Sequence, residues 1–213
     1  MDKSDENNRI LKICETLSTE IKDPHTELNY ISEYTFLISV VMSAQTTDVQ
    51  VNKVTEKLFK EYNTIERILE LGVDGLAEQI KSIGFFRTKA KNIIALSCLL
   101  KEKFNSQVPR TREELMSLPG VGQKTANVVL NTLFNMPFIA VDTHVLRLSK
   151  RLELSSSDDP KQVEEDLLEK IPQNYHNVIS NLLVLFGRRI CTAKKPKCNQ
   201  CCLRNICKFN ELG

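Results

Sequence analysis

The 213-residue sequence lacks any run of about 18 apolar residues, so no segment of it is expected to span a membrane. Its first eight residues are polar and partly acidic, which argues against a secretory signal peptide and an arginine-rich transit peptide. A strong charge of one sign is also absent, because the formal net charge is only +2. These absences predict an intracellular, cytoplasmic protein and exclude an integral membrane protein.

Sustained alternation of apolar and polar residues, the mark of half-buried β-strands, is missing as well. Apolar residues recur instead at helical spacing along almost the whole chain, as at Val51, Val54 and Leu58. Thr111 and Glu114 form the pattern of a capping box at the start of one helical segment. The sequence therefore predicts an all-α protein of about ten short helices, long enough for a sizeable core in one domain or two small ones.

Glycine and proline are scarce, with seven of each, yet Pro119, Gly120 and Gly122 stand close together. They predict a tight turn, and the apolar spacing between residues 126 and 133 predicts a helix directly after it. Lys124 then lies in the first turn of that helix, where the partial positive charge of the helix N-terminus disfavours another cation. Because a lysine that gives up its proton is a nucleophile, Lys124 is a candidate catalytic amine. The alternative is a solvated surface lysine.

A single aspartate follows eighteen residues later, at Asp142. It comes after the apolar segment 139–141 and directly before a new helical pattern that begins at Thr143. A carboxylate in this position either caps the helix or takes part in the chemistry of Lys124, and a capping carboxylate can do both. The sequence thus combines a lysine and an aspartate with a glycine turn that is able to hold a phosphate.

Seven cysteines are present, and five of them lie between residues 191 and 207. Four of these have the spacing C-x6-C-x2-C-x5-C and are Cys191, Cys198, Cys201 and Cys207. A chain without an export signal is not expected to form disulfides, so these thiolates predict a shared cation. The unequal spacing favours a cubane iron–sulfur cluster, and structural zinc is the alternative. Cys202, next to Cys201, leaves a shifted ligand set open.

Basic residues are concentrated at the C-terminal end of the sequence. From Gly187 onward there are seven basic residues and one acidic residue, a net charge of +6 that leaves −4 for the preceding part. A basic end on such a body is typical of a polyanion contact. The alternatives are a solubilising tail and local compensation of the cysteine thiolates.

Together these motifs resemble the endonuclease III family of DNA glycosylases, in the helix-hairpin-helix superfamily. The resemblance rests on LPGVGQKTANVVLNT at 118–132, AVDTHVLRL at 140–148 and the cysteine spacing. It extends to SAQTTD at 43–48 and IGFFRTKAKNI at 83–93, and covers the chain from about residue 30 to 208.

The resemblance implies a bifunctional DNA glycosylase and AP lyase of base excision repair that removes oxidised pyrimidines from damaged double-stranded DNA. Lys124 matches the family nucleophile, which attacks C1′ and forms a Schiff base, and Asp142 matches its essential aspartate. An adenine-removing mismatch glycosylase is the closest rival, but such enzymes lack the lysine after the hairpin and carry an extra C-terminal domain. We expect a monomer that is associated with the nucleoid.

The family also implies how DNA is held. Backbone N–H groups of the hairpin Pro119-Gly120-Val121-Gly122 are expected to contact a phosphate, which positions the strand without reading its sequence. Gln45 matches the residue that fills the space of the flipped nucleotide, and Ile83 and Phe85 match an apolar wedge in the base stack. Leucine is expected at Phe85 in better-known members, and a histidine often stands at Phe186.

The implied architecture has two helical lobes with the DNA cleft between them. One lobe comprises residues 24–136 and contains the helix-hairpin-helix at about 112–133. The other joins residues 1–23 to 137–213 and carries a [4Fe-4S] cluster on the loop 191–207, held by the four spaced cysteines. Since Lys124 ends the first lobe and Asp142 begins the second, the active site is expected at their junction.

Overall fold

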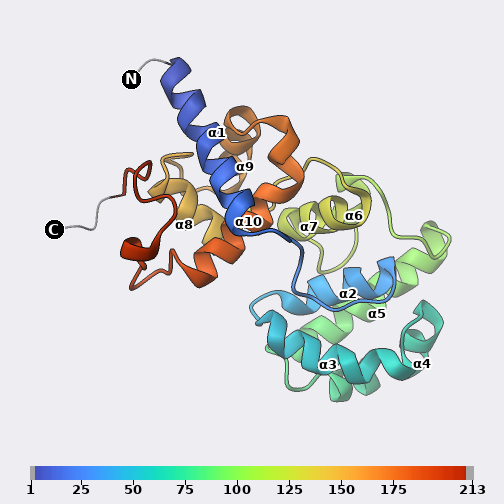
Figure 1. Cartoon of the computed structure of the whole chain (residues 1–213). Helices are drawn as coiled ribbons and strands as arrows, with labels where there is room; N and C mark the ends of the chain where they lie inside the picture. The colour runs from blue at the N-terminus through green and yellow to red at the C-terminus, as the bar shows by residue number, and fades with distance from the viewer. Residues whose placement is uncertain (1–2, 210–213) are drawn as a thin grey trace. The chain divides into compact units, whose positions relative to one another are not determined.

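A computed structural model describes residues 3–209 of the chain, and within that range it contains ten α-helices, two short 3-10 helices and no β-strand. The predicted all-α fold is confirmed (Figure 1). No helix between residues 3 and 209 is long and apolar enough to cross a membrane. The chain divides into two compact units, unit 1 with Met1–Thr26 and Asn135–Gly213, and unit 2 with Glu27–Phe134. These limits lie within a few residues of the domain limits expected from the sequence.

Unit 2 is built around one buried helix. Its helices are α2 (Glu33–Ser43), α3 (Asp48–Glu61), α4 (Ile65–Gln79), α5 (Phe86–Lys103), α6 (Arg112–Met116) and α7 (Gln123–Phe134). Every residue of α2 from Tyr34 to Met42 is buried, and α3, α5 and α7 all contact this helix. A helix that is apolar on all sides is stable only inside a protein, so α2 forms the centre of the unit.

Side-chain caps define where several helices of unit 2 begin. The N-cap residues Ser32, Thr47, Thr64 and Thr111 each accept a hydrogen bond from a backbone N–H in the first turn. Of the capping box expected at Thr111, the bond from the backbone N–H of Glu114 to the Thr111 hydroxyl is present at 3.3 Å, and that hydroxyl donates in turn to the Glu114 carboxylate at 2.7 Å. α4 is interrupted at Gly72, whose φ of 62° divides the segment into two helical parts.

The connection between α6 and α7 is a tight turn of four residues. The N–H of Val121 donates to the carbonyl of Leu118 at 3.1 Å, with Pro119 and Gly120 at the central positions. Gly120 has a φ of 81°, and proline followed by a residue of positive φ is the signature of a type II turn. A Cβ at Gly120 would lie 3.0 Å from the Asn92 side chain, so the backbone conformation favours glycine here and the space for a side chain is tight.

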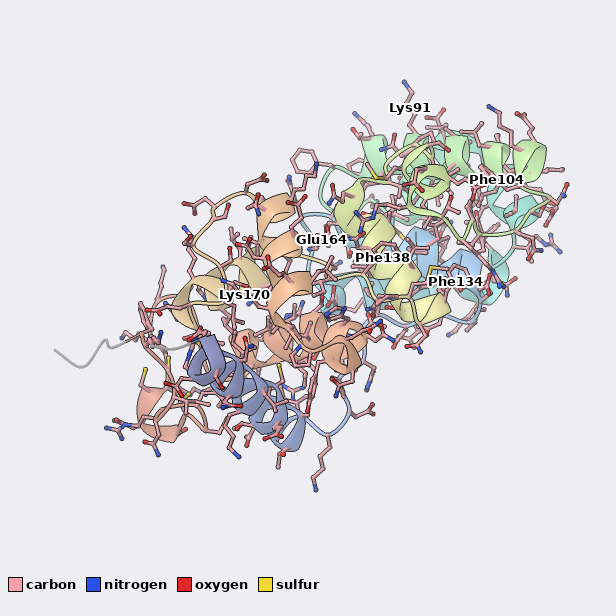
Figure 2. The ribbon with its side chains drawn as sticks, turned by 90° about the horizontal axis from the view of Figure 1, so that it is seen from above. Lys91, Phe104, Phe134, Phe138, Glu164 and Lys170 are labelled. Carbon is pink, nitrogen blue, oxygen red and sulfur yellow. The ribbon has the colours of Figure 1, made fainter. Side chains whose placement is uncertain are left out.

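Unit 1 gathers the N-terminal helix and the last third of the chain around a second core. It contains α1 (Lys3–Glu20), α8 (Thr143–Arg151), α9 (Pro160–Lys170), α10 (His176–Arg189) and the 3-10 helices η1 (Gln173–Tyr175) and η2 (Cys198–Gln200). α1 lies beside α10, and its buried residues Ile10, Ile13 and Leu17 join those of the later helices in one cluster (Figure 1). At the end of α9, Lys170 donates to the carbonyl of Leu154 at 2.8 Å (Figure 2).

Replacing Gly120 by alanine is expected to destabilise the protein by about 1–2 kcal/mol, because a Cβ disfavours the positive φ and meets Asn92. Gly122→Ala is the matched control: Gly122 has no positive φ and no atom within 4 Å of the added Cβ. Thermal unfolding of both variants beside the wild type measures the difference. Equal melting temperatures for the two variants would contradict the turn assignment.

Candidate functional site

Lys124 is the second residue of α7, directly after the turn. Its side chain is exposed, and the first turn of α7 contains no acidic residue. The backbone N–H of Ala126 donates to the carbonyl of Gly122 at 2.9 Å at the start of this helix. Around it, Gly120 and Gly122 are exposed whereas Val121 is buried, so the hairpin offers solvent its backbone rather than its apolar side chain.

Asp142 stands at the start of α8 as its N-cap residue. One carboxylate oxygen, Oδ1, accepts the backbone N–H groups of His144 and Val145, both at 2.8 Å. The segment before it is buried, and the N–H of Ala140 donates to Ser180 Oγ of α10 at 2.9 Å. The predicted capping role is therefore confirmed. Asp142 belongs to unit 1 and Lys124 to unit 2, and the geometry of each is fixed within its own unit.

The segments that carry Gln45 and Phe85 lie side by side within unit 2. A Cβ on Gly84 would be 3.7 Å from the carbonyl of Gln45, and Gln50 Nε2 donates to Ser82 Oγ at 2.9 Å. Gln45 and Phe85 both adopt a left-handed conformation, with φ of 53° and 57°. Both side chains are exposed, and Phe85 is 69% exposed. This arrangement is unusual, since residues with a Cβ seldom adopt positive φ.

Ile83 does not share this surface. Its side chain is 1% exposed and belongs to the hydrophobic core of unit 2. A buried side chain supports the loop from below and presents nothing to a partner, so the wedge expectation for Ile83 is not supported by its position. Of the two apolar residues expected there, only Phe85 faces solvent.

Sequence reasoning missed Lys89, which connects both segments. Lys89 is 5% exposed, and its Nζ donates to the carbonyls of Met42 and Ala44 and to the Thr46 hydroxyl. Burial lowers the pKa of the Lys89 ammonium group below its ordinary value. The signal was present in the sequence, because Lys89 occupies the buried helical stripe that continues through Ala90 and Ile93.

The cysteine segment of unit 1 surrounds a cavity with about 370 Å³ of empty space, part of it open to solvent. All four spaced cysteines line it: Cys191, Cys198, Cys201 and Cys207. Its other walls include the apolar residues Leu148, Phe186 and Leu203. Cys202 is exposed and does not line the cavity, which argues against the shifted ligand set. Phe186, where a histidine was expected, is 2% exposed and serves as a wall of this cavity.

Two arginines of α8 hold the cysteine segment in place. Arg147 Nη2 donates to the carbonyls of Gly187 and Cys191, both at 3.0 Å. Arg151 Nη1 lies 3.3 Å from Cys191 Sγ and donates to the carbonyl of Thr192 at 2.8 Å. Positive charge beside the thiols is therefore supplied by α8, in addition to the basic C-terminal residues noted in the sequence.

Burial makes two of the cavity thiols, those of Cys201 and Cys207, weaker acids than an ordinary thiol. It raises the pKa of Cys201 to about 11 and raises that of Cys207 as well. In the described part of the chain, no three or more His, Cys, Asp or Glu side chains are close enough to hold a single metal ion. The four thiols thus surround a space and do not converge on one point.

Comparison with known proteins identifies the family. A family model described as HhH-GPD superfamily base excision DNA repair protein matches residues 38–173. Endonuclease III of Rickettsia felis is 50% identical over 198 residues, which cover 93% of this chain and 93% of the relative. A solved non-covalent Endonuclease III–DNA complex matches with a TM-score of 0.90 at 43% identity over 95% of each chain. A trapped Endonuclease III–DNA covalent intermediate matches with a TM-score of 0.87 at 43% identity over 92% of each chain.

The family match covers more than half of the chain, and the relative is similar over nearly its whole length. The chain therefore belongs to the endonuclease III family of the HhH-GPD superfamily and is a DNA glycosylase with AP lyase activity in base excision repair.

Proposed function

We propose that Lys124 and Asp142 are the catalytic residues of this enzyme, and that it removes oxidised pyrimidines such as thymine glycol from double-stranded DNA. The observation that carries the proposal is the exposed Lys124 amine on the first turn of α7, directly after an exposed glycine turn. A relative trapped as a covalent intermediate with DNA supports a protein nucleophile. Because DNA is the substrate, the enzyme acts where the chromosome lies, at the nucleoid.

In the proposed reaction the uncharged amine of Lys124 attacks C1′ of the damaged nucleotide. The new N–C1′ bond forms as the bond between C1′ and the base breaks, and the base leaves with the electron pair of that bond. Asp142 stabilises the positive charge that develops at C1′ and takes part in the proton transfer that opens the sugar. The resulting Schiff base makes the C2′ proton acidic, so β-elimination breaks the C3′–O bond and releases the 3′ phosphate.

The hairpin supplies position rather than chemistry. The N-terminus of α7 carries partial positive charge, and the glycines allow a phosphate to approach the backbone closely. In the proposal, the phosphate binds at residues 119–122 and brings the adjacent sugar to Lys124. Such a contact is independent of base sequence, which suits an enzyme that must examine any stretch of DNA.

Extrusion of the nucleotide is assigned to the paired loops, which we define as residues 43–47 and 80–86. A base inside a duplex is inaccessible, and the flipped nucleotide leaves a gap that must be filled. Gln45 is polar and exposed, which suits it to fill the gap, and the ring of Phe85 suits a wedge between base pairs. Ile83 is left out of this assignment because it is buried.

The cysteine cavity is assigned to a [4Fe-4S] cluster. Four half-buried thiols with apolar walls and an arginine donor suit a cluster, whose potential and stability depend on burial and hydrogen bonds to sulfur. Thiols spread around a cavity fit a group of several atoms better than one zinc ion, which needs ligands about 2.3 Å from its centre. The four cysteines would hold the cluster and be cross-linked by it within residues 191–207, while Arg151 of α8 would donate to the sulfur of Cys191.

Borohydride trapping on a duplex with one thymine glycol tests the nucleophile. Wild-type protein is expected to form a covalent adduct, and Lys124→Gln is expected to form none because the amide cannot make a Schiff base. Lys60→Gln, which changes another exposed lysine of unit 2, serves as the control and should trap like wild type. An adduct with Lys124→Gln would assign the nucleophile elsewhere, and base release without any adduct would indicate a monofunctional glycosylase.

The two roles of Asp142 can be separated by substitution. Asparagine is as good an N-cap as aspartate, so Asp142→Asn should keep the melting temperature while base excision falls about 100- to 10,000-fold. Asp142→Ala should lose the same activity and about 1 kcal/mol of stability as well. Single-turnover excision and thermal unfolding measure the two effects. A wild-type excision rate in Asp142→Asn would reduce Asp142 to a helix cap.

Metal analysis tests the cofactor. Protein purified without oxygen is expected to contain about four iron atoms and to absorb at about 400 nm. Cys198→Ser should lose iron and accumulate less folded protein, whereas Cys202→Ser should keep both, since Cys202 lies outside the cavity. One zinc ion per chain and no absorbance in that range would overturn the assignment. Loss of iron in Cys202→Ser would instead indicate that Cys202 is one of the cluster ligands.

A further inference from the structure

Lys89 is a charged residue in a place where charge is costly. It lies on α5 with 5% of its surface exposed, among the buried residues of that helix. Lys91, two positions later on the same helix, is exposed and projects outward (Figure 2). A buried ammonium group is stable only when its donors are satisfied, so the contacts of Lys89 indicate its role.

All three hydrogen bonds of the Lys89 ammonium go to the end of α2 and the loop that follows it. Nζ donates to the carbonyl of Met42 at 2.8 Å, to that of Ala44 at 2.6 Å and to Thr46 Oγ1 at 2.9 Å. The last carbonyls of a helix lack partners within the helix and carry partial negative charge. Because Met42 is buried, the ammonium group takes the place of water at its carbonyl.

The same residue also contacts the second loop through its backbone. The N–H of Lys89 donates to the carbonyl of Phe85 at 3.0 Å, which closes the first turn of α5. Phe85 and Gln45 both have positive φ, a conformation that residues with a Cβ seldom adopt without support from their surroundings. Lys89 thus binds the residues on both sides of Gln45 through its side chain and Phe85 through its backbone.

We propose that Lys89 is a positioning residue for DNA insertion: its ammonium group holds the paired loops in the one arrangement that presents Gln45 and Phe85 to the duplex together. The inference rests on the proposed function, in which these two side chains enter the DNA. Lys89 itself is buried and does not touch the substrate. Its effect on base excision therefore passes through Gln45 and Phe85.

The charge and the donors of Lys89 are what the proposal requires. Methionine has a similar length and apolar stem but no donor, so Lys89→Met leaves the buried carbonyl of Met42 and the carbonyl of Ala44 without this partner. Arginine keeps the charge and the donors, so Lys89→Arg should recover part of the function. Thr46→Val removes only one of the three acceptors and provides a milder variant if Lys89→Met fails to fold.

Single-turnover excision of thymine glycol tests the coupling. Lys89→Met is expected to lower the rate about 100-fold, the scale of a small misplacement of groups that must act together. In the Gln45→Ala/Phe85→Ala background, the same change should have no further effect, because the side chains it positions are gone. The proposal would be overturned if Lys89→Met lowered the rate by the same factor in the Gln45→Ala/Phe85→Ala protein as in the wild type. A wild-type rate in Lys89→Met would overturn it as well.

Tyr34→Phe is the matched structural control. The hydroxyl groups of Tyr34 and Ser97 form a buried hydrogen bond of 2.7 Å within unit 2 and away from the paired loops. This variant loses a buried polar contact, as Lys89→Met does, but should excise the base at the wild-type rate. If both variants lose activity in proportion to their lowered melting temperatures, Lys89 is merely structural and the proposal fails.

Hydrogen exchange provides a readout that does not depend on catalysis. Lys89→Met and Thr46→Val should speed amide exchange at residues 43–47, while exchange in α7 and in the Lys91→Met control remains at the wild-type rate. Unchanged exchange in the loop would overturn the proposal. If instead the wild-type enzyme releases no base, or Gln45→Ala/Phe85→Ala is fully active, the assigned insertion role fails even when the exchange result holds.

Discussion

The carboxyl end of α2 is the constraint on which unit 2 depends. A helix that is buried as far as Met42 cannot leave the carbonyl of that residue to water, so the fold must bring a donor to it. The ammonium group of Lys89 meets this need, and the loop after α2 and the start of α5 are shaped around it. Two strained residues, Gln45 and Phe85, are thereby held in place by a contact that lies in the interior.

Backbone geometry also positions the two residues that we propose to be catalytic, Asp142 and Lys124. Asp142 ends a buried extended segment and caps α8 through one carboxylate oxygen, so its orientation is determined by backbone N–H groups rather than by a flexible environment. Lys124 follows a type II turn whose positive φ at Gly120 favours glycine, and this turn fixes where α7 begins. In both cases the start of a helix defines the position of a residue that we propose to be catalytic.

Local patterns predicted much of this from the sequence. Helical spacing, the capping pair at Thr111 and the position of Lys124 in the first turn depend on neighbouring residues, and a sequence displays neighbours directly. The sequence did not distinguish the buried Ile83 from the exposed Phe85. The directions of two side chains near a helix junction can be predicted only when the conformation of the local turn is known. Lys89 was missed because its partners lie more than forty residues away. A local sequence pattern cannot predict such a distant contact. The only sign of it in the sequence is a lysine within the buried face of a predicted helix.

One further consequence follows from the placement of α8. The helix has nine residues and a length of about 13 Å, with Asp142 at its start and Arg151, which binds the cysteine segment, at its end. A short helix moves as a rigid rod, so a shift at one end tilts the other. One short helix thus carries the proposed catalytic carboxylate at its start and holds the cysteine segment at its end, so a displacement of that segment would reach Asp142 through α8 alone.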